Sequence, residues 1–125
     1  MIALDTSALI GFLQGDNTPA AAAAGAVFAE RHACLPPVVL TEVLSDPKLP
    51  RRVADLIGAL PVLELSDGYW RRAGGLRAQV LAAGHRARLA DTLIAQICLD
   101  HNVGLVSSDR DFRHFAKAGG LRLLP

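Results

Sequence analysis

The chain has 125 residues, of which 51% are hydrophobic, and its formal net charge is +1. This length suits one domain, residues 1–125, around one core, and the composition excludes a disordered tail or linker protein. No apolar run is long enough to span a membrane, and Asp5 interrupts the apolar start that a signal peptide would need, so we expect a cytoplasmic protein. Cys34 and Cys98 have apolar neighbours and form no CxxC or Cys/His cluster, which favours buried free thiols over a disulfide or a zinc site.

Short apolar runs alternate with helical segments along the chain. Thr18-Pro19 is typical of a helix start, with Thr18 as the cap and proline in the first turn, and Asp67 is expected to cap a later helix. In chain order, the sequence predicts a strand at 2–5, helices at 7–14 and 18–32, a strand at 33–35, helices at 37–44 and 49–60, a strand at 62–65, helices at 67–83 and 87–101, a strand at 103–107, a helix at 110–118 and an edge strand at 121–124.

This alternation predicts an α/β fold with a mainly parallel central sheet of four to five short strands. The run 103–107 has no polar alternation, as expected for a parallel strand that is covered on both faces. Sheets of this kind bind ligands at the carboxyl ends of their strands. Asp5 and Asp109 both follow a predicted strand directly, so we expect the functional site there.

The segment 87–101 is the clearest amphipathic helix. Its apolar residues fall within an arc of about 180° and are Leu89, Leu93, Ile94, Ile97 and Cys98. Asp91 lies just outside this arc, in the first turns of the helix. Its carboxylate is therefore expected to border the core and to face a neighbouring strand end.

Five acidic residues stand at the ends of apolar runs or inside them: Asp5, Glu42, Asp91, Asp109 and Asp111. Each has an ordinary explanation, since Asp5 and Asp109 can cap the helices that follow them and Asp111 can be a first-turn helix acid. Their convergence on one sheet edge is harder to explain in that way, because carboxylates gathered in an apolar setting need compensation. A shared divalent cation provides it, and hard oxygen ligands select Mg²⁺ or Mn²⁺.

The same residues carry a resemblance to a known family. The stretches 4–9 (LDTSAL), 41–44 (TEVL), 91–95 (DTLIA) and 105–112 (LVSSDRDF) occur in an order and spacing that cover the whole chain. The chain resembles the PIN-domain ribonucleases, most closely the VapC-type toxins of bacterial toxin–antitoxin pairs. The resemblance implies a three-layer α/β/α fold, RNA cleavage that depends on Mg²⁺ or Mn²⁺, a homodimer and inhibition by a small antitoxin protein.

Position by position, the resemblance also implies site residues. Asp5, Glu42, Asp91 and Asp109 match the acidic quartet of the family, and all are present, which argues against an inactive copy. At the periphery of the site, Asp111 matches an additional acid, Ser7 matches a hydroxyl residue, and Ser107 stands where Thr is usual.

We expect Asp5 and Asp91 to bind the metal directly and Asp109 to bind it directly or through water. Glu42 is expected to orient the attacking water or to help hold a second ion.

Basic residues are almost all Arg, the side chain that binds phosphate through two parallel hydrogen bonds. Arg86 and Arg88 precede Asp91, and Arg110 and Arg113 flank the last acids, so these four are the candidates for RNA contacts. The more distant Arg residues are expected to be solvated surface: Arg51, Arg52, Arg71 and Arg72.

Three other interpretations compete with this resemblance. A phosphorylated receiver domain needs an acid pair after its first strand and a Lys after a late strand, and the chain has neither. A haloacid-dehalogenase-type phosphatase needs Asp-x-Asp at the first strand, where this chain has Asp5-Thr6-Ser7. The third is a non-catalytic PIN-like scaffold that binds RNA or protein, which only a cleavage assay separates from an enzyme.

Overall fold

The computed structural model describes residues 1–124, and Pro125, the last residue of the predicted domain, lies outside them. In chain order the elements are β1 (Ile2–Leu4), α1 (Thr6–Leu13), α2 (Pro19–Ala29), β2 (Ala33–Cys34), α3 (Pro37–Leu44), α4 (Arg51–Gly58), α5 (Tyr69–Ala82), α6 (Leu89–His101), β3 (Gly104–Val106), α7 (Phe112–Gly119) and β4 (Leu123–Leu124).

Within the described residues, four strands form one parallel sheet in the order β2-β1-β3-β4. Strand β1 pairs with β2 on one side and with β3 on the other, so that Ala3 lies opposite Cys34 of β2 and Leu105 of β3. Both β1 and β3 are almost wholly buried, which explains why their sequences are apolar without alternation. The prediction of a mainly parallel sheet of short strands is confirmed.

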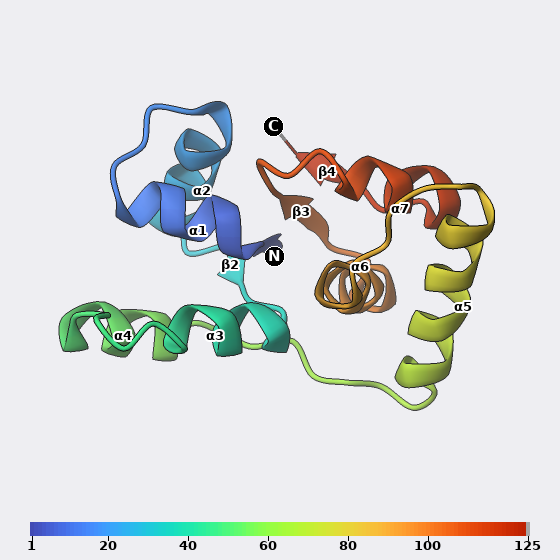
Figure 1. Cartoon of the computed structure of the whole chain (residues 1–125). Helices are drawn as coiled ribbons and strands as arrows, with labels where there is room; N and C mark the ends of the chain where they lie inside the picture. Colours follow the sequence, from blue (N-terminus) through green and yellow to red (C-terminus); the bar gives the residue numbers. More distant parts are fainter. Residues whose placement is uncertain (125) are drawn as a thin grey trace.

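Helices cover both faces of the sheet. Figure 1 shows α1 and α2 on one side, and α5, α6 and α7 on the other, with α3 and α4 below α1. Two large side chains of α7, Phe112 and Phe115, are fully buried and extend the core beneath the last strand. The three-layer α/β/α arrangement that the resemblance implied is therefore present. No helix of residues 1–124 is long and apolar enough to cross a membrane.

Local signals placed several helix ends correctly. The Thr18 hydroxyl accepts a hydrogen bond from the Ala21 amide at 3.1 Å, as the predicted cap of α2 requires. The predicted cap at Asp67 is wrong, because α5 begins at Tyr69 after Gly68, which has φ +81°. The left-handed backbone at Gly68 redirects the chain, and the Asp67 carbonyl instead accepts a hydrogen bond from Arg72 at 2.7 Å.

The strand predicted at 62–65 does not form. Only Val62 forms a parallel bridge, opposite Leu35, supported by a hydrogen bond from the Leu63 amide to the Leu35 carbonyl at 2.9 Å. Pro36 and Pro37 follow Leu35 directly and have no amide hydrogen to donate. A longer ladder at this edge therefore has no partner groups to continue it.

Helix α6 is buried on more sides than an amphipathic stripe predicts. Ile94, Ile97 and Cys98 are buried as predicted, but Leu89 is 61% exposed and the prediction that it faces the core is wrong. Leu89 is the first residue of α6 and lines a cleft between α5 and α6. Thr92 and Gln96 are buried because α3, α5 and α7 also pack around α6. Both Cys98 and Cys34 are buried free thiols, as predicted.

Candidate metal centre

The carboxyl ends of β1 and β3 meet at the centre of the sheet, where the chain connections diverge to opposite sides. This is the position at which open α/β sheets bind ligands. Asp5 follows β1 directly and Asp109 follows β3 after two serines, so the predicted sheet edge brings both acids together. The Asp5 amide also donates to the Val106 carbonyl at 3.1 Å, which ties the two strand ends to each other.

Asp5 is held in place by several hydrogen bonds. Its Oδ1 accepts the Ala8 amide at 2.8 Å, so Asp5 is indeed the cap of α1. The Ser7 hydroxyl donates to Oδ1 at 2.8 Å and to Oδ2 at 3.0 Å. The Ser107 hydroxyl donates to Oδ2 at 2.5 Å. Asp5 can therefore cap α1 and belong to the site at the same time, because its carboxylate also lines the cleft beside the strand ends.

The two serines predicted at the periphery of the site link its acids. Ser107 donates to Asp5 and accepts a hydrogen bond from the Asp109 amide at 2.9 Å. The Ser7 hydroxyl accepts a hydrogen bond from the Ser108 amide at 3.3 Å, so the segment after β1 and the segment after β3 hold each other in place. The Ser107 hydroxyl therefore fulfils the role that either Ser or Thr can provide at this position.

Asp109 does not cap a helix that begins at residue 110. Its Oδ1 accepts a hydrogen bond from the Asp111 amide at 2.9 Å, which closes a tight turn before α7 begins at Phe112. Asp111 is the residue before the helix, and its side chain forms no capping bond. The turn leaves both carboxylates free to face α6.

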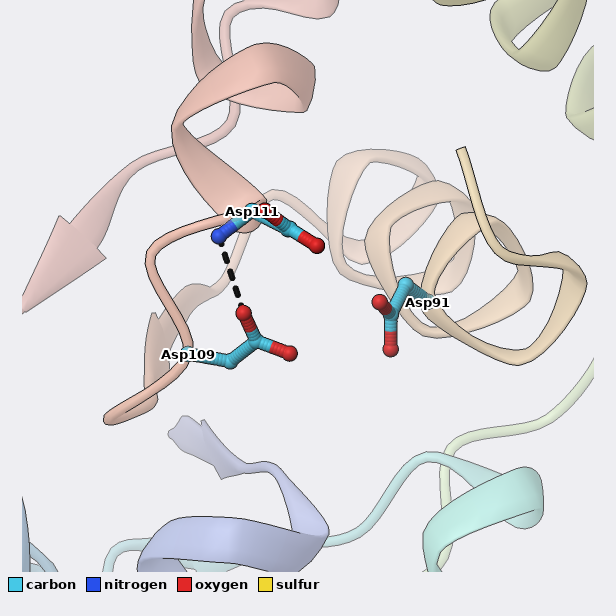
Figure 2. A group of neighbouring side chains, drawn as sticks. All are labelled: Asp91, Asp109 and Asp111. Atoms are coloured by element: carbon cyan, nitrogen blue, oxygen red, sulfur yellow. Dashed lines mark hydrogen bonds between the residues drawn. The ribbon is translucent and has the colours of Figure 1, made fainter. Parts of the chain in front are cut away.

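Three carboxylates meet in front of α6. Asp91, Asp109 and Asp111 each offer an oxygen, and these oxygens lie within 4.8 Å of one another. Figure 2 shows the three side chains converging from α6, from the loop after β3 and from the start of α7. Asp111 is thus a closer member of the group than its predicted peripheral position.

The donor set fits a divalent cation. Asp91 Oδ2 is a buried oxygen that accepts no hydrogen bond from any residue in 1–124. A buried carboxylate oxygen without a donor is costly unless a cation compensates it. The neighbouring ligands are all carboxylate oxygens, which suit Mg²⁺ or Mn²⁺ better than zinc.

The electrostatics of the group point in the same direction. Burial first, and then the nearby charges of Asp109, Asp5 and Asp111, raise the pKa of Asp91 to about 6, whereas Arg88 opposes the shift. Burial likewise raises the pKa of Asp5, against the hydrogen bonds from Ser107, Ala8 and Ser7. Like charges held together favour protonation in the absence of a cation.

This shift predicts how stability depends on pH. The pKa of Asp91 is about 6 in the folded state against a usual value of 3.8, so between these values the folded state binds more protons than the unfolded state. Without metal, the contribution of Asp91 to stability is present below about pH 4 and is lost as the pH rises through about 6. We expect wild type to lose about 0.5–1 kcal/mol more than Asp91→Asn between about pH 5 and pH 7, after allowance for solvent screening.

Chemical denaturation in chelator at both pH values measures this difference. The comparison with Asp91→Asn cancels the titration of other groups, including Asp100, whose pKa is lowered mainly by its hydrogen bond from Arg72. Equal pH slopes for wild type and variant would show that Asp91 is not in a crowded carboxylate group.

Asp5, Asp91 and Asp109 border a cleft of about 250 Å³ that Glu42 also lines. Glu42 lies on α3, is exposed, and accepts a hydrogen bond from the Thr6 hydroxyl at 2.7 Å. Thr6 was not identified from the sequence as a site residue. Its signal was the hydroxyl run Thr6-Ser7 directly after Asp5, which places two donors in the first turn of α1.

The predicted RNA-contacting Arg residues are all exposed: Arg86, Arg88, Arg110 and Arg113. Of these, Arg88 also lines the acidic cleft. In the second group Arg51, Arg52 and Arg71 are exposed, as predicted.

Arg72 is exposed as well, but unlike the other three it forms an ion pair that links two helices. Its Nε and Nη2 donate to the two oxygens of Asp100 at 2.9 and 2.7 Å, and Gln96 donates to the same carboxylate at 2.9 Å. This bidentate pair ties α5 to α6. The partner lies 28 residues away in sequence, so no local pattern indicates it.

Comparisons with known proteins agree with this geometry. The PIN domain family model matches residues 2–118. The chain is 29% identical to VapC ribonuclease Mb1587 of Mycobacterium bovis and to Ribonuclease VapC11 of Mycobacterium tuberculosis, in each case over 98% of this chain and 96% of the relative.

Solved structures show the same fold at low sequence identity. VapBC2 from Rickettsia felis, bound to a DNA fragment from its promoter, matches with a TM-score of 0.73 and 17% identity over 99% of this chain and 98% of that chain. FitAcB from Neisseria gonorrhoeae matches with a TM-score of 0.72 and 17% identity over 100% and 97% of the two chains. DNA-bound VapBC from Salmonella typhimurium matches with a TM-score of 0.71 and 19% identity over 99% and 98%.

Proposed function

Since the chain belongs to the PIN-domain family, we propose that it is a ribonuclease that hydrolyses RNA phosphodiester bonds with Mg²⁺ or Mn²⁺ and serves as the toxin of a toxin–antitoxin pair. The observation that carries the proposal is the convergence of Asp91, Asp109 and Asp111 around a buried carboxylate oxygen without a donor. The ribonuclease names of the full-length relatives support the choice of RNA. The receiver-domain and phosphatase interpretations have no comparable support.

The residues of the cleft would divide the work. Asp91, Asp109 and Asp111 would hold the cation, with Asp5 beside them, fixed by Ser107. A bound Mg²⁺ or Mn²⁺ supplies a coordinated water of lowered pKa and neutralises charge that develops on the phosphate.

Glu42 would orient the attacking water or help hold a second ion. Its carboxylate is the one acid of the predicted quartet that comes from α3, and the Thr6 hydroxyl fixes its position. No His lines the cleft among the described residues, so the acids and water carry the proton transfers.

The direct test is cleavage of single-stranded RNA by purified protein. Cleavage is expected with Mg²⁺ or Mn²⁺ and is expected to stop when a chelator is added. Metal binding without cleavage of any RNA tested would favour the non-catalytic PIN-like scaffold.

We predict that the Arg residues beside the site guide the RNA phosphates. Replacing Arg86, Arg88, Arg110 and Arg113 by Gln is expected to weaken RNA binding and to flatten its dependence on salt, by roughly 0.7–0.9 in log–log slope for each phosphate that the variant no longer neutralises. Fluorescence anisotropy at several salt concentrations, in chelator, measures both quantities.

The matched control replaces Arg51, Arg52 and Arg71, which are exposed and distant in sequence from the acids. Arg72 is excluded from the control because its replacement would also break the pair with Asp100. An equal weakening of binding in the control would overturn the assignment of the first group.

The protein partner is proposed to dock beside the acidic cleft. A groove of about 300 Å³ lies between α1 and the α3–α4 hairpin, lined by Ile10, Leu13, Val43, Leu49 and Val53. Its rim carries Glu42 and Asp46, and Glu42 belongs to the acidic cleft as well. An amphipathic antitoxin segment with a basic residue fits this combination, since its cation can satisfy carboxylates that otherwise need metal.

We predict that expression of the chain alone arrests growth and that co-expression with the neighbouring upstream gene restores it. The two proteins are expected to co-purify, and Ile10→Asp, which places a charge in the groove at a position that is 36% exposed in the free chain, is expected to break the complex. Harmless expression of active enzyme, together with no complex, would leave a nuclease but remove the toxin assignment.

We also propose a homodimer. Tyr69 and Trp70 are neighbours in sequence but differ in exposure: Tyr69 is buried and its hydroxyl donates to the Leu93 carbonyl at 2.7 Å, whereas Trp70 is 65% exposed. Trp70 and the exposed Leu89 line one cleft between α5 and α6. This apolar face is the candidate contact between two copies.

A further inference from the structure

A second cleft lies apart from the acidic one, between the end of α5 and α7. It has a volume of about 380 Å³ and shares no lining residue with the acidic cleft. The polar residues that line it are Gln79, His85, His114 and Lys117. Neither the acidic group nor the partner groove accounts for it.

Two histidine rings stack face to face in its wall. The ring centroids of His85 and His114 are 4.1 Å apart, and the ring planes differ by 10°. His85 is exposed and follows Gly84, whose φ of +85° turns the chain out of α5, while His114 is half-buried on α7. The His85 amide donates to the Val80 carbonyl at 3.2 Å, which fixes the loop that presents the ring. One face of His85 stacks on His114, and the residue as a whole stays exposed.

The chemistry of the wall suits a nucleotide. A planar nitrogen heterocycle is a stacking surface for an unpaired base. Gln79 adds an amide that can donate to and accept from a base edge, and Lys117 adds a cation for a phosphate. Within residues 1–124, no Asp or Glu lines this cleft, so nothing there repels a polyanion.

The cleft is also near the acids. The His114 amide donates to the Asp111 carbonyl at 3.1 Å, so the stacked pair lies about one helical turn, or roughly 5 Å, along α7 from the acidic group. The loop from α5 to α6 that carries His85 continues through Arg86 and Arg88 to the start of α6, and Figure 1 shows it passing α7. An RNA strand in contact with these Arg residues would run from one cleft to the other.

We propose that the His85–His114 stack is a subsite for an unpaired nucleobase of the RNA, next to the acidic cleft. The inference rests on the proposed ribonuclease function and adds the position at which a base outside the scissile bond is bound. Stacking is tolerant of base identity, so the subsite selects single-stranded over paired RNA more strongly than it selects a sequence.

Binding of a short fluorescein-labelled single-stranded RNA, measured by anisotropy in chelator, tests the subsite without cleavage. His85→Ala is expected to bind about five- to a hundredfold more weakly than wild type, the range for removal of one aromatic–base stack. His85→Phe keeps a stacking face without the imidazole nitrogens and is expected to retain most of the affinity. His32→Ala removes an exposed His at the end of α2 and is expected to bind like wild type.

A second probe separates base stacking from effects on folding. RNA with abasic nucleotides is expected to lose affinity for wild type by a similar factor and to lose little for His85→Ala. If His85→Ala binds like wild type, or if His85→Phe is as weak as His85→Ala, no base stacks there and the proposal is wrong. If wild type cleaves RNA but His85→Ala binds RNA equally well, the subsite proposal is wrong and the ribonuclease proposal stands. If binding depends on the base at His85 but no RNA is cleaved, the ribonuclease proposal is wrong and the subsite stands.

Discussion

Asp91→Asn is expected to lower the rate of RNA cleavage by at least about a hundredfold, with Asp109→Asn and Asp5→Asn behaving similarly. Asp91 contributes the buried oxygen without a donor and stands with Asp109 and Asp111 around one point. An amide has nearly the same shape as a carboxylate but no charge, so the remaining acids no longer hold a cation in the same place. Single-turnover cleavage of a labelled RNA at several Mn²⁺ concentrations measures the decrease in rate.

The matched control is Asp55→Asn, which makes the same chemical change at an exposed position on α4. It is expected to cleave like wild type. If all three site variants stayed folded and kept full metal-dependent cleavage, the assignment of the site would be wrong. Asp111→Asn tests whether Asp111 is a peripheral acid or a direct metal ligand. A decrease in cleavage rate as large as that of Asp91→Asn would place it among the direct ligands.

The second large effect is on stability. Without metal, Asp91→Asn is expected to melt at or above the temperature of wild type, although it removes a side chain of the site. Burial and neighbouring acids raise the pKa of Asp91 to about 6, so its charge is unfavourable without a cation. An Asn amide also offers hydrogens to the nearby carboxylates of Asp109 and Asp111.

Metal is expected to reverse this order. At a Mn²⁺ concentration about a hundredfold above Kd, binding to the folded state adds about 2.7 kcal/mol. For a domain of this size, that raises the Tm of wild type by roughly 10 °C, and the Tm of Asp91→Asn by much less. Differential scanning fluorimetry gives the Tm of wild type and of Asp91→Asn, each with Mn²⁺ and with chelator. Asp55→Asn is the control and is expected to follow wild type. A wild-type Tm that does not respond to metal would indicate surface acids without a shared ion.

Much of the fold and of the site could be predicted because the signals are local. Pro37 fixes the start of α3, Thr18 caps α2, and the apolar runs of β1 and β3 identify the buried strands. Parallel strands end at a common edge, so Asp5 and Asp109 could be placed together without coordinates.

The features that could not be predicted depend on interactions between distant segments. The missing strand at 62–65 reflects the prolines that follow its partner. Leu89 stands in the first turn of α6, where it lines a cleft between α5 and α6 and stays exposed. Asp111 joins the metal group because Asp109 closes a turn onto its amide. The stack of His85 on His114 joins a loop to a helix that follows it by one helix and one strand, and neither residue has a sequence signal of its own.

The location of manganese in a crystal grown or soaked with Mn²⁺ tests the central claim most directly. We expect an anomalous difference peak in the acidic cleft, within bonding distance of Asp91, Asp109 and Asp111 oxygens, and no such peak in Asp91→Asn crystals under the same conditions. A wild-type cleft without manganese at saturating Mn²⁺, or manganese bound only at other surface acids, would contradict the assignment of these carboxylates as the metal centre.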